Sequence, residues 1–74
     1  MQLKQKRKNV VEFCVAVKAL KAGLNFDQIE TCGKYAANYY ETHDCSTAKA
    51  VEVGMQEISK FSALNIINRL TVKI

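Results

Sequence analysis

Apolar residues recur at intervals of three and four along the first third of the chain. The stronger of two apolar stripes in this segment consists of Val10, Phe13, Cys14, Val17, Leu20 and Leu24. A second, weaker stripe consists of Val11, Val15, Ala19 and Ala22. This spacing predicts an amphipathic helix. Because the helix is apolar on two sides, we expect it to lie in the centre of the fold or to be shared with another subunit.

The end of this first segment favours a helix over a strand. The stretch "NVVEFCVAV" contains four β-branched valines, which would also suit a strand. Lys18 and Lys21, however, suit the last turn of a helix. Gly23 suits the left-handed position that ends a helix, and Leu24 supplies the hydrophobic contact that commonly follows it. We therefore predict a helix that ends just before Gly23.

A second helix is predicted after "KAGLN". Asn25 can cap it, with Gln28 three residues later in the arrangement of a capping box. Gly33 and Ala36 are small, so a neighbouring helix can approach closely at these positions. The apolar stripe of this second helix consists of Phe26, Ile29, Cys32, Gly33, Ala36, Tyr40 and His43.

A third helix is predicted after "THDCST", with Asp44 or Ser46 as its cap. Its stripe begins as Ala48, Val51, Met55, Ile58 and Phe61. From Ile58 onward the apolar residues recur every third position instead, through Leu64 and Ile67 to Leu70, so the stripe drifts around an ideal helix. Either the apolar face wraps around this helix, or a new short helix begins near Ser62. The last residues, "LTVKI", favour an extended or frayed end.

Together these patterns predict an all-α fold with a single domain over residues 1–74. We expect a small bundle of three main helices at residues 4–22, 26–43 and 46–61, with a short fourth element at the C-terminus. The predicted core consists of Val10, Phe13, Cys14, Val17, Leu20, Phe26, Ile29, Cys32, Ala36, Tyr40, Val51, Met55, Ile58, Phe61 and Leu64.

The composition is sufficient for a core, but the short length of the chain limits its stability. The 74 residues are 49% hydrophobic and include no proline, which is enough for a core and favours unbroken helices. So short a chain buries a smaller fraction of its surface than a large one, and it usually needs a disulfide, a metal, good helix packing or a partner subunit.

The net charge of +4 is concentrated at the N-terminus. Lys4, Lys6, Arg7 and Lys8 account for all of it, because the chain has eleven basic and seven acidic residues overall. Residues 1–8 therefore form a basic N-terminal arm or a basic first turn. Such a segment either contacts phosphates or is simply solvated.

The three cysteines are an odd number, which favours free thiols in a reducing compartment over a framework of disulfides. The basic start followed by "VVEFCVAV" resembles a signal peptide, but Glu12 and Lys18 interrupt the apolar run. That run is also too short to cross a membrane. We therefore expect a cytoplasmic protein without a membrane segment.

One stretch, "ETCGKYAANYYETHDC", contains side chains that could hold a metal or act in catalysis. Cys32, His43 and Cys45 in this stretch, with Cys14 farther off, carry atoms that suit tetrahedral zinc. The intervening stretches have seventeen, ten and one residues, whereas zinc sites usually use ligand pairs two to four residues apart. A cysteine nucleophile with His43 as its base would need a cleft that a three-helix chain rarely forms. We infer no catalytic residue, metal, cofactor or small-molecule substrate.

Two kinds of macromolecular partner are left to consider. The stretch "GLNFDQIETCGKYAANYY" begins like a helix-turn-helix, but its apolar stripe continues where that motif needs a turn, and "STAKAVEVGMQE" is a poor major-groove surface. Nucleic acid could still contact Lys4, Lys6, Arg7 and Lys8, which is our alternative prediction.

Our main prediction is a small regulatory or accessory binding protein that acts through protein–protein contacts, including self-association. Proteins encoded by phages and mobile elements often have this size and lack of catalytic motifs. The last third of the chain has more apolar residues than one helix needs for its own core. The predicted contact surface consists of Leu64, Ile67 and Leu70, together with Val11 and Val15.

Overall fold

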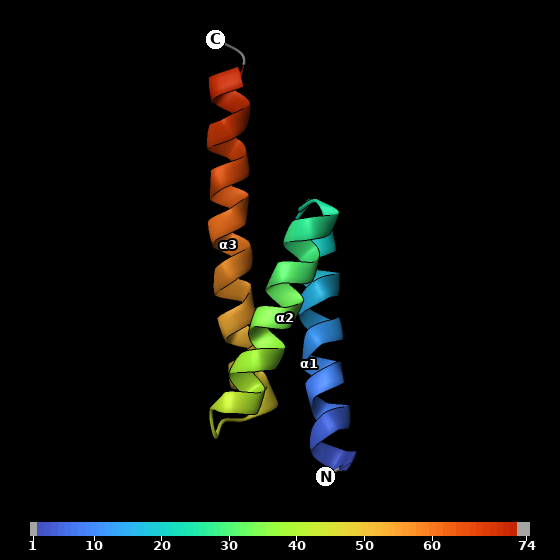
Figure 1. Cartoon of the computed structure of the whole chain (residues 1–74). Helices are drawn as coiled ribbons and strands as arrows, with labels where there is room; N and C mark the ends of the chain where they lie inside the picture. Colours follow the sequence, from blue (N-terminus) through green and yellow to red (C-terminus); the bar gives the residue numbers. More distant parts are fainter. Residues whose placement is uncertain (1, 73–74) are drawn as a thin grey trace.

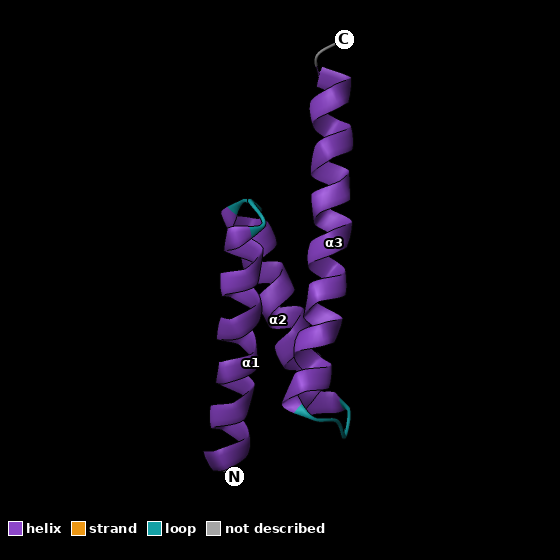
Figure 2. Cartoon of the chain, turned by 180° about the vertical axis from the view of Figure 1, so that it is seen from behind, coloured by secondary structure: helices purple, strands orange, loops and turns teal. Residues whose placement is uncertain are grey.

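Three helices make up nearly all of the protein in a computed structural model, which describes residues 2–72. They are α1 (Gln2–Lys21), α2 (Phe26–Thr42) and α3 (Thr47–Val72). Figure 1 shows α1 and α2 side by side as an antiparallel hairpin, with α3 running back along the hairpin and beyond the turn between α1 and α2. The view from behind shows the same arrangement (Figure 2). The molecule is accordingly elongated, with extents of 52 × 18 × 15 Å.

The predicted all-α fold with three helices is confirmed, with differences at the ends. α1 already begins at Gln2, so the basic residues 4–8 belong to its first turns and do not form an extended arm. α3 continues without a break to Val72, so the predicted fourth element and the extended end are wrong within the described residues. Lys73 and Ile74 lie outside them. None of the helices within residues 2–72 combines the length and the apolar character that a bilayer span requires.

Local hydrogen bonds end α1 as predicted. Gly23 has a φ of 84°, a left-handed conformation that glycine adopts without steric cost. The backbone N–H of Leu24 donates to the carbonyl of Ala19 at 3.2 Å, and that of Gly23 donates to the carbonyl of Leu20 at 3.0 Å. This pair of bonds is a Schellman motif, which satisfies carbonyls that the helix would otherwise leave free. The chain can therefore reverse within a few residues.

The starts of α2 and α3 also follow the prediction. The side chain of Asn25 accepts a hydrogen bond from the backbone of Gln28, whose own side chain accepts one from the backbone of Asn25. This reciprocal pair is a capping box. Of the two candidates for the third cap, Ser46 is the one used, because its hydroxyl accepts from the backbone N–H of Lys49 at 3.1 Å.

The core lies on the weaker of the two apolar stripes of α1. Val11, Val15 and Ala19 are fully buried. The predicted core positions Phe13 and Leu20 are instead 69% and 65% exposed. The other predicted core residues that prove to be exposed are Val10, Phe26, Met55 and Leu64.

The rest of the predicted core is closer to the structure. Cys14 and Val17 are half-buried on α1. The predicted positions that are buried are Cys32, Ala36, Tyr40 and Ile58. The predicted positions that are partly buried and pack against the core are Ile29, Val51 and Phe61.

A close approach of all three helices at Gly54 explains why α1 buries the face with Val11, Val15 and Ala19. A Cβ atom on Gly54 would lie 2.6 Å from Cγ2 of Val15 and 3.0 Å from Cβ of Ala36. A second close approach joins α1 and α2, where a Cβ on Gly33 would lie 3.1 Å from the carbonyl oxygen of Glu12. Bulky residues such as Phe13 cannot occupy such a crossing, so the faces of α1, α2 and α3 with small residues pack together.

We expect Gly54→Ala to destabilise the protein by about 1–3 kcal/mol, because the added methyl group overpacks the crossing. The clash is with the methyl groups of Val15, so the same substitution should cost less in a Val15→Ala background. Urea unfolding of the wild type, the two single variants and the double variant forms a double-mutant cycle. It measures the coupling free energy between Gly54 and Val15. Equal costs of Gly54→Ala in both backgrounds would contradict the assigned packing.

Candidate protein-binding surfaces

The C-terminal part of α3 extends beyond the rest of the bundle. Near the start of this part, a reciprocal amide pair joins α3 to α2, in which Gln28 and Asn65 each donate to the other's oxygen at 3.0 Å. Gln28 lies in the first turn of α2, so α3 passes the end of the hairpin at this level (Figure 1). We call the segment from Leu64 to Val72 the projecting end of α3.

Apolar side chains on the projecting end face away from the bundle. Three residues turn a helix by about 300°, so an apolar residue at every third position moves the stripe by about 60° per step. Ile58 is buried and Phe61 is half-buried, whereas Leu64, Ile67 and Leu70 are 47%, 58% and 62% exposed. The stripe therefore winds from the core to the outside, as in the first of the two predicted alternatives.

Only some of the residues predicted to form the contact surface are exposed. Leu64, Ile67 and Leu70 lie together on the projecting end, and the neighbouring Ile66 is also exposed. Val11 and Val15 are fully buried at the helix crossing, so their assignment to a contact surface was wrong. Ala50 and Gly54 are the sequence signal that could have corrected it. These small residues lie one helical turn apart on α3, so the helix that packs there can approach closely and must also present small residues.

A second exposed apolar surface lies on the outer face of α1, opposite its buried stripe. We call it the outer seam and define it as Leu3, Val10, Phe13, Val17 and Leu20. All of these residues are exposed except Val17, which is half-buried. A depression of about 260 Å³ lies next to the outer seam. Its lining residues are Phe13, Cys14, Val17, Lys18 and Lys21.

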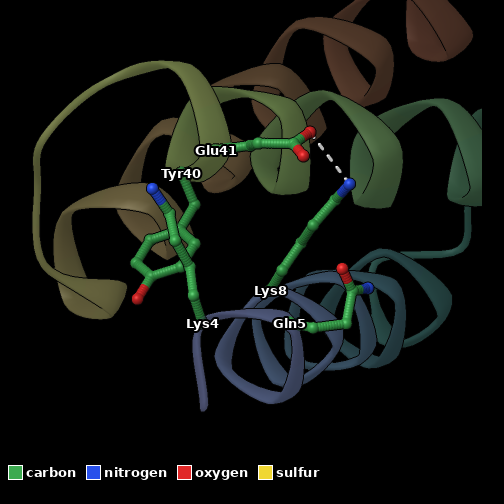
Figure 3. A pocket seen from close by; sticks show the side chains of 5 residues that line it. All are labelled: Lys4, Gln5, Lys8, Tyr40 and Glu41. Carbon is green, nitrogen blue, oxygen red and sulfur yellow. Dashed lines mark hydrogen bonds and ion pairs between the residues drawn. The ribbon is translucent and has the colours of Figure 1, made fainter. Parts of the chain in front are cut away.

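The four basic residues of the alternative prediction do not form one surface. They lie on a regular helix, where successive side chains point about 100° apart. Lys4, Lys6 and Arg7 are exposed, whereas Lys8 forms an ion pair with Glu41 of α2 at 2.9 Å. Figure 3 shows Lys8 reaching across to Glu41 at the edge of a depression. Its lining residues are Lys4, Gln5, Lys8, Tyr40 and Glu41, and its volume is about 280 Å³.

An adjoining depression of about 400 Å³ shares Lys4 and Tyr40 and also contains Arg7, His43 and Asp44 in its lining. Acidic Glu41 and Asp44 thus face basic residues across this end of the bundle. The mixture of charges gives neither depression a strong preference for an anion.

The residues of the stretch that suggested metal or catalytic chemistry make local contacts. The ring of His43 stacks on Tyr39 with 4.0 Å between the ring centroids. Its Nδ1 lies 3.0 Å from the Thr42 hydroxyl oxygen and 3.3 Å from the Tyr39 carbonyl oxygen. Within residues 2–72, no three His, Cys, Asp or Glu side chains are grouped closely enough to hold a metal ion.

The three thiols differ in their surroundings. All are free, with Cys32 buried and Cys14 and Cys45 half-buried. Burial raises the pKa of the Cys32 thiol above its ordinary value, and the carboxylate of Glu57 raises this pKa further. Thiolates are the reactive form, so the structure makes Cys32 the least reactive of the three.

We expect iodoacetamide at mildly alkaline pH to label Cys14 and Cys45 in the folded protein before Cys32, which should react only when the protein unfolds. Peptide mass spectrometry after a short pulse measures the three rates, with a urea-unfolded sample as the control. The raised pKa also predicts that stability is lost as the pH rises through the folded-state pKa of Cys32, because the unfolded thiol ionises first. Early labelling of Cys32 in the folded protein would contradict its place in the core.

Comparisons of the chain with family models, with curated proteins and with solved structures found no match.

Proposed function

We propose that the protein is a non-enzymatic binding protein of the regulatory or accessory kind, which acts through protein–protein contacts. The observation that carries this proposal is the placement of apolar side chains by size. The largest fully buried side chains are Val11, Val15 and Cys32. Larger apolar side chains are exposed instead at Leu64, Ile67 and Leu70 on the projecting end and at Phe13 and Leu20 on the outer seam. Free thiols suit a reducing compartment such as the cytoplasm.

The exposed area is larger than that of a compact protein of the same mass. A compact monomer of 8.3 kDa exposes roughly 4,600 Å² by the scaling of surface with mass. The protein exposes 5347 Å². The excess of about 750 Å² accompanies the elongated shape, in which the projecting end of α3 extends past the hairpin (Figure 1).

The first partner that we propose is a second copy of the chain, joined through the projecting end. Leu64, Ile67 and Leu70 carry the contact, as the sequence predicted, and Ile66 extends it. Arg69 is the only charged residue from Leu64 to Val72, so two projecting ends can approach with little electrostatic repulsion. Pairing would cover apolar side chains that the hairpin is too short to reach.

Replacing Ile67 with Asp should abolish self-association and leave helicity unchanged, because the Ile67 side chain is 58% exposed and is not part of the buried core. Sedimentation equilibrium over a range of micromolar concentrations measures the assembly, and circular dichroism checks the helices. Phe13→Asp is the matched control, since it places the same charge at an exposed apolar position of α1. A wild-type chain that stays monomeric, or an Ile67→Asp variant that assembles normally, would refute the proposal.

The second candidate function is nucleic-acid binding through the first turns of α1. It is favoured by one observation: of the four basic residues there, only Lys8 has an acidic partner within the described part of the chain. Lys4, Lys6 and Arg7 could therefore contact phosphates, and Lys18 and Lys21 add positive charge farther along the helix.

Changing Lys4, Lys6, Arg7 and Lys8 to Ala should then abolish binding to random-sequence duplex DNA and leave the fold intact. Binding by the wild-type chain should weaken steeply with salt, with a logarithmic slope of about −0.9 for each phosphate contacted. A fluorescence anisotropy titration at several salt concentrations measures both effects. Full binding by the four-residue variant would exclude these residues as the site.

A further inference from the structure

We propose that the outer seam of α1 binds an acidic amphipathic helix of another protein. The inference rests on the proposed function in taking a protein as the partner. It uses a surface on the opposite side of α1 from the core, separate from the projecting end of α3. Its failure would therefore leave self-association through the projecting end intact.

The spacing of the outer seam is that of a helix-pairing surface. Together with Lys6, its residues follow one another at intervals of three, four, three, four and three: Leu3, Lys6, Val10, Phe13, Val17 and Leu20. These are the a and d positions of a heptad repeat, which form the narrow contact stripe of a coiled coil. The core of the protein does not use this stripe, because the buried face of α1 is the one with Val11, Val15 and Ala19.

The surface beside the seam has a place for a side chain of the partner. The depression of about 260 Å³ is lined by the seam residues Phe13 and Val17 together with Cys14, Lys18 and Lys21. Paired helices insert apolar side chains of one helix into holes between side chains of the other. An apolar side chain of the partner that enters this hole would carry neighbouring residues to within reach of both lysines.

The charge of α1 determines which helix can pair with it. The helix contains one acidic residue, Glu12, against six basic ones: Lys4, Lys6, Arg7, Lys8, Lys18 and Lys21. Glu12 is half-buried and packs beside Gly33 of α2, away from the seam. The e positions next to the seam are Arg7, Cys14 and Lys21, so charged partners there must be acidic.

The N-terminus of α1 gives a second electrostatic reason for an acidic partner. The first turn of a helix favours negative charge, because the helix dipole is positive there. α1 has no acidic residue in its first turn, and Lys4, Lys6 and Arg7 add positive charge near the same end. A carboxylate from a partner would interact favourably with these side chains and with the dipole.

The same features argue against the other occupants of the seam. A second copy of α1 would bring six more basic residues against the first six. A lipid surface suits a broad apolar face, whereas this stripe is narrow and contains Lys6. Nucleic acid would leave Phe13 and Leu20 without an apolar partner.

The test uses two synthetic peptides of three heptads, each with Leu at the a and d positions. One has Glu at every e and g position, and the matched control has Lys there. Fluorescence anisotropy of each labelled peptide is titrated with the full-length protein. We expect the Glu peptide to bind, with an affinity that falls as salt is added, and the Lys peptide not to bind.

Phe13→Asp should weaken binding of the Glu peptide by roughly thirtyfold or more, the size expected for a buried aromatic anchor. Ile67→Asp should leave it unchanged, although the same variant should lose self-association. Leu20→Asp provides a second seam variant if Phe13→Asp alters the circular dichroism spectrum.

Three results would overturn the proposal: no binding of the Glu peptide, equal binding of both peptides, or undiminished binding by the folded seam variants. Phosphatidylserine vesicles and duplex DNA are titrated in parallel. Binding to either that depends on Phe13, without binding of the Glu peptide, would assign the seam to a lipid surface or to nucleic acid instead.

Discussion

The close approach of three helices at Gly54 is the constraint on which the rest of the structure depends. Val15 from α1 and Ala36 from α2 meet α3 where a single methyl group would not fit. Helices can approach this closely only where the facing side chains are small. The face of α1 that packs inside is therefore the one with small residues, and the face with Phe13 and Leu20 is left outside.

This arrangement links stability to binding. A core whose largest fully buried side chains are valines and a cysteine gains less from the hydrophobic effect than one built from leucine and phenylalanine. The apolar surface that could have strengthened the core is exposed on the projecting end and on the outer seam. A partner that covers either surface would add to the stability of the folded state, since it binds that state selectively.

The sequence predicted the helices well because their ends depend on neighbouring residues. The capping box of Asn25 and Gln28 and the left-handed Gly23 were recognisable from local spacing alone. The buried face of α1 was not recognisable, because the stripe with larger residues was predicted to form the core. Which face of α1 is buried depends on Gly54, which is distant in sequence. The same limit led to the wrong assignment of Val11 and Val15 to a contact surface.

We propose that the projecting end of α3 is uncovered in one copy and covered by a second. Hydrogen–deuterium exchange of the backbone amides between Leu64 and Val72, measured over a range of protein concentrations, tests this claim most directly. We predict rapid exchange in dilute protein and increasing protection as the concentration rises, while the amides around Val15 stay protected throughout. Exchange in the projecting end that is independent of concentration would contradict the claim.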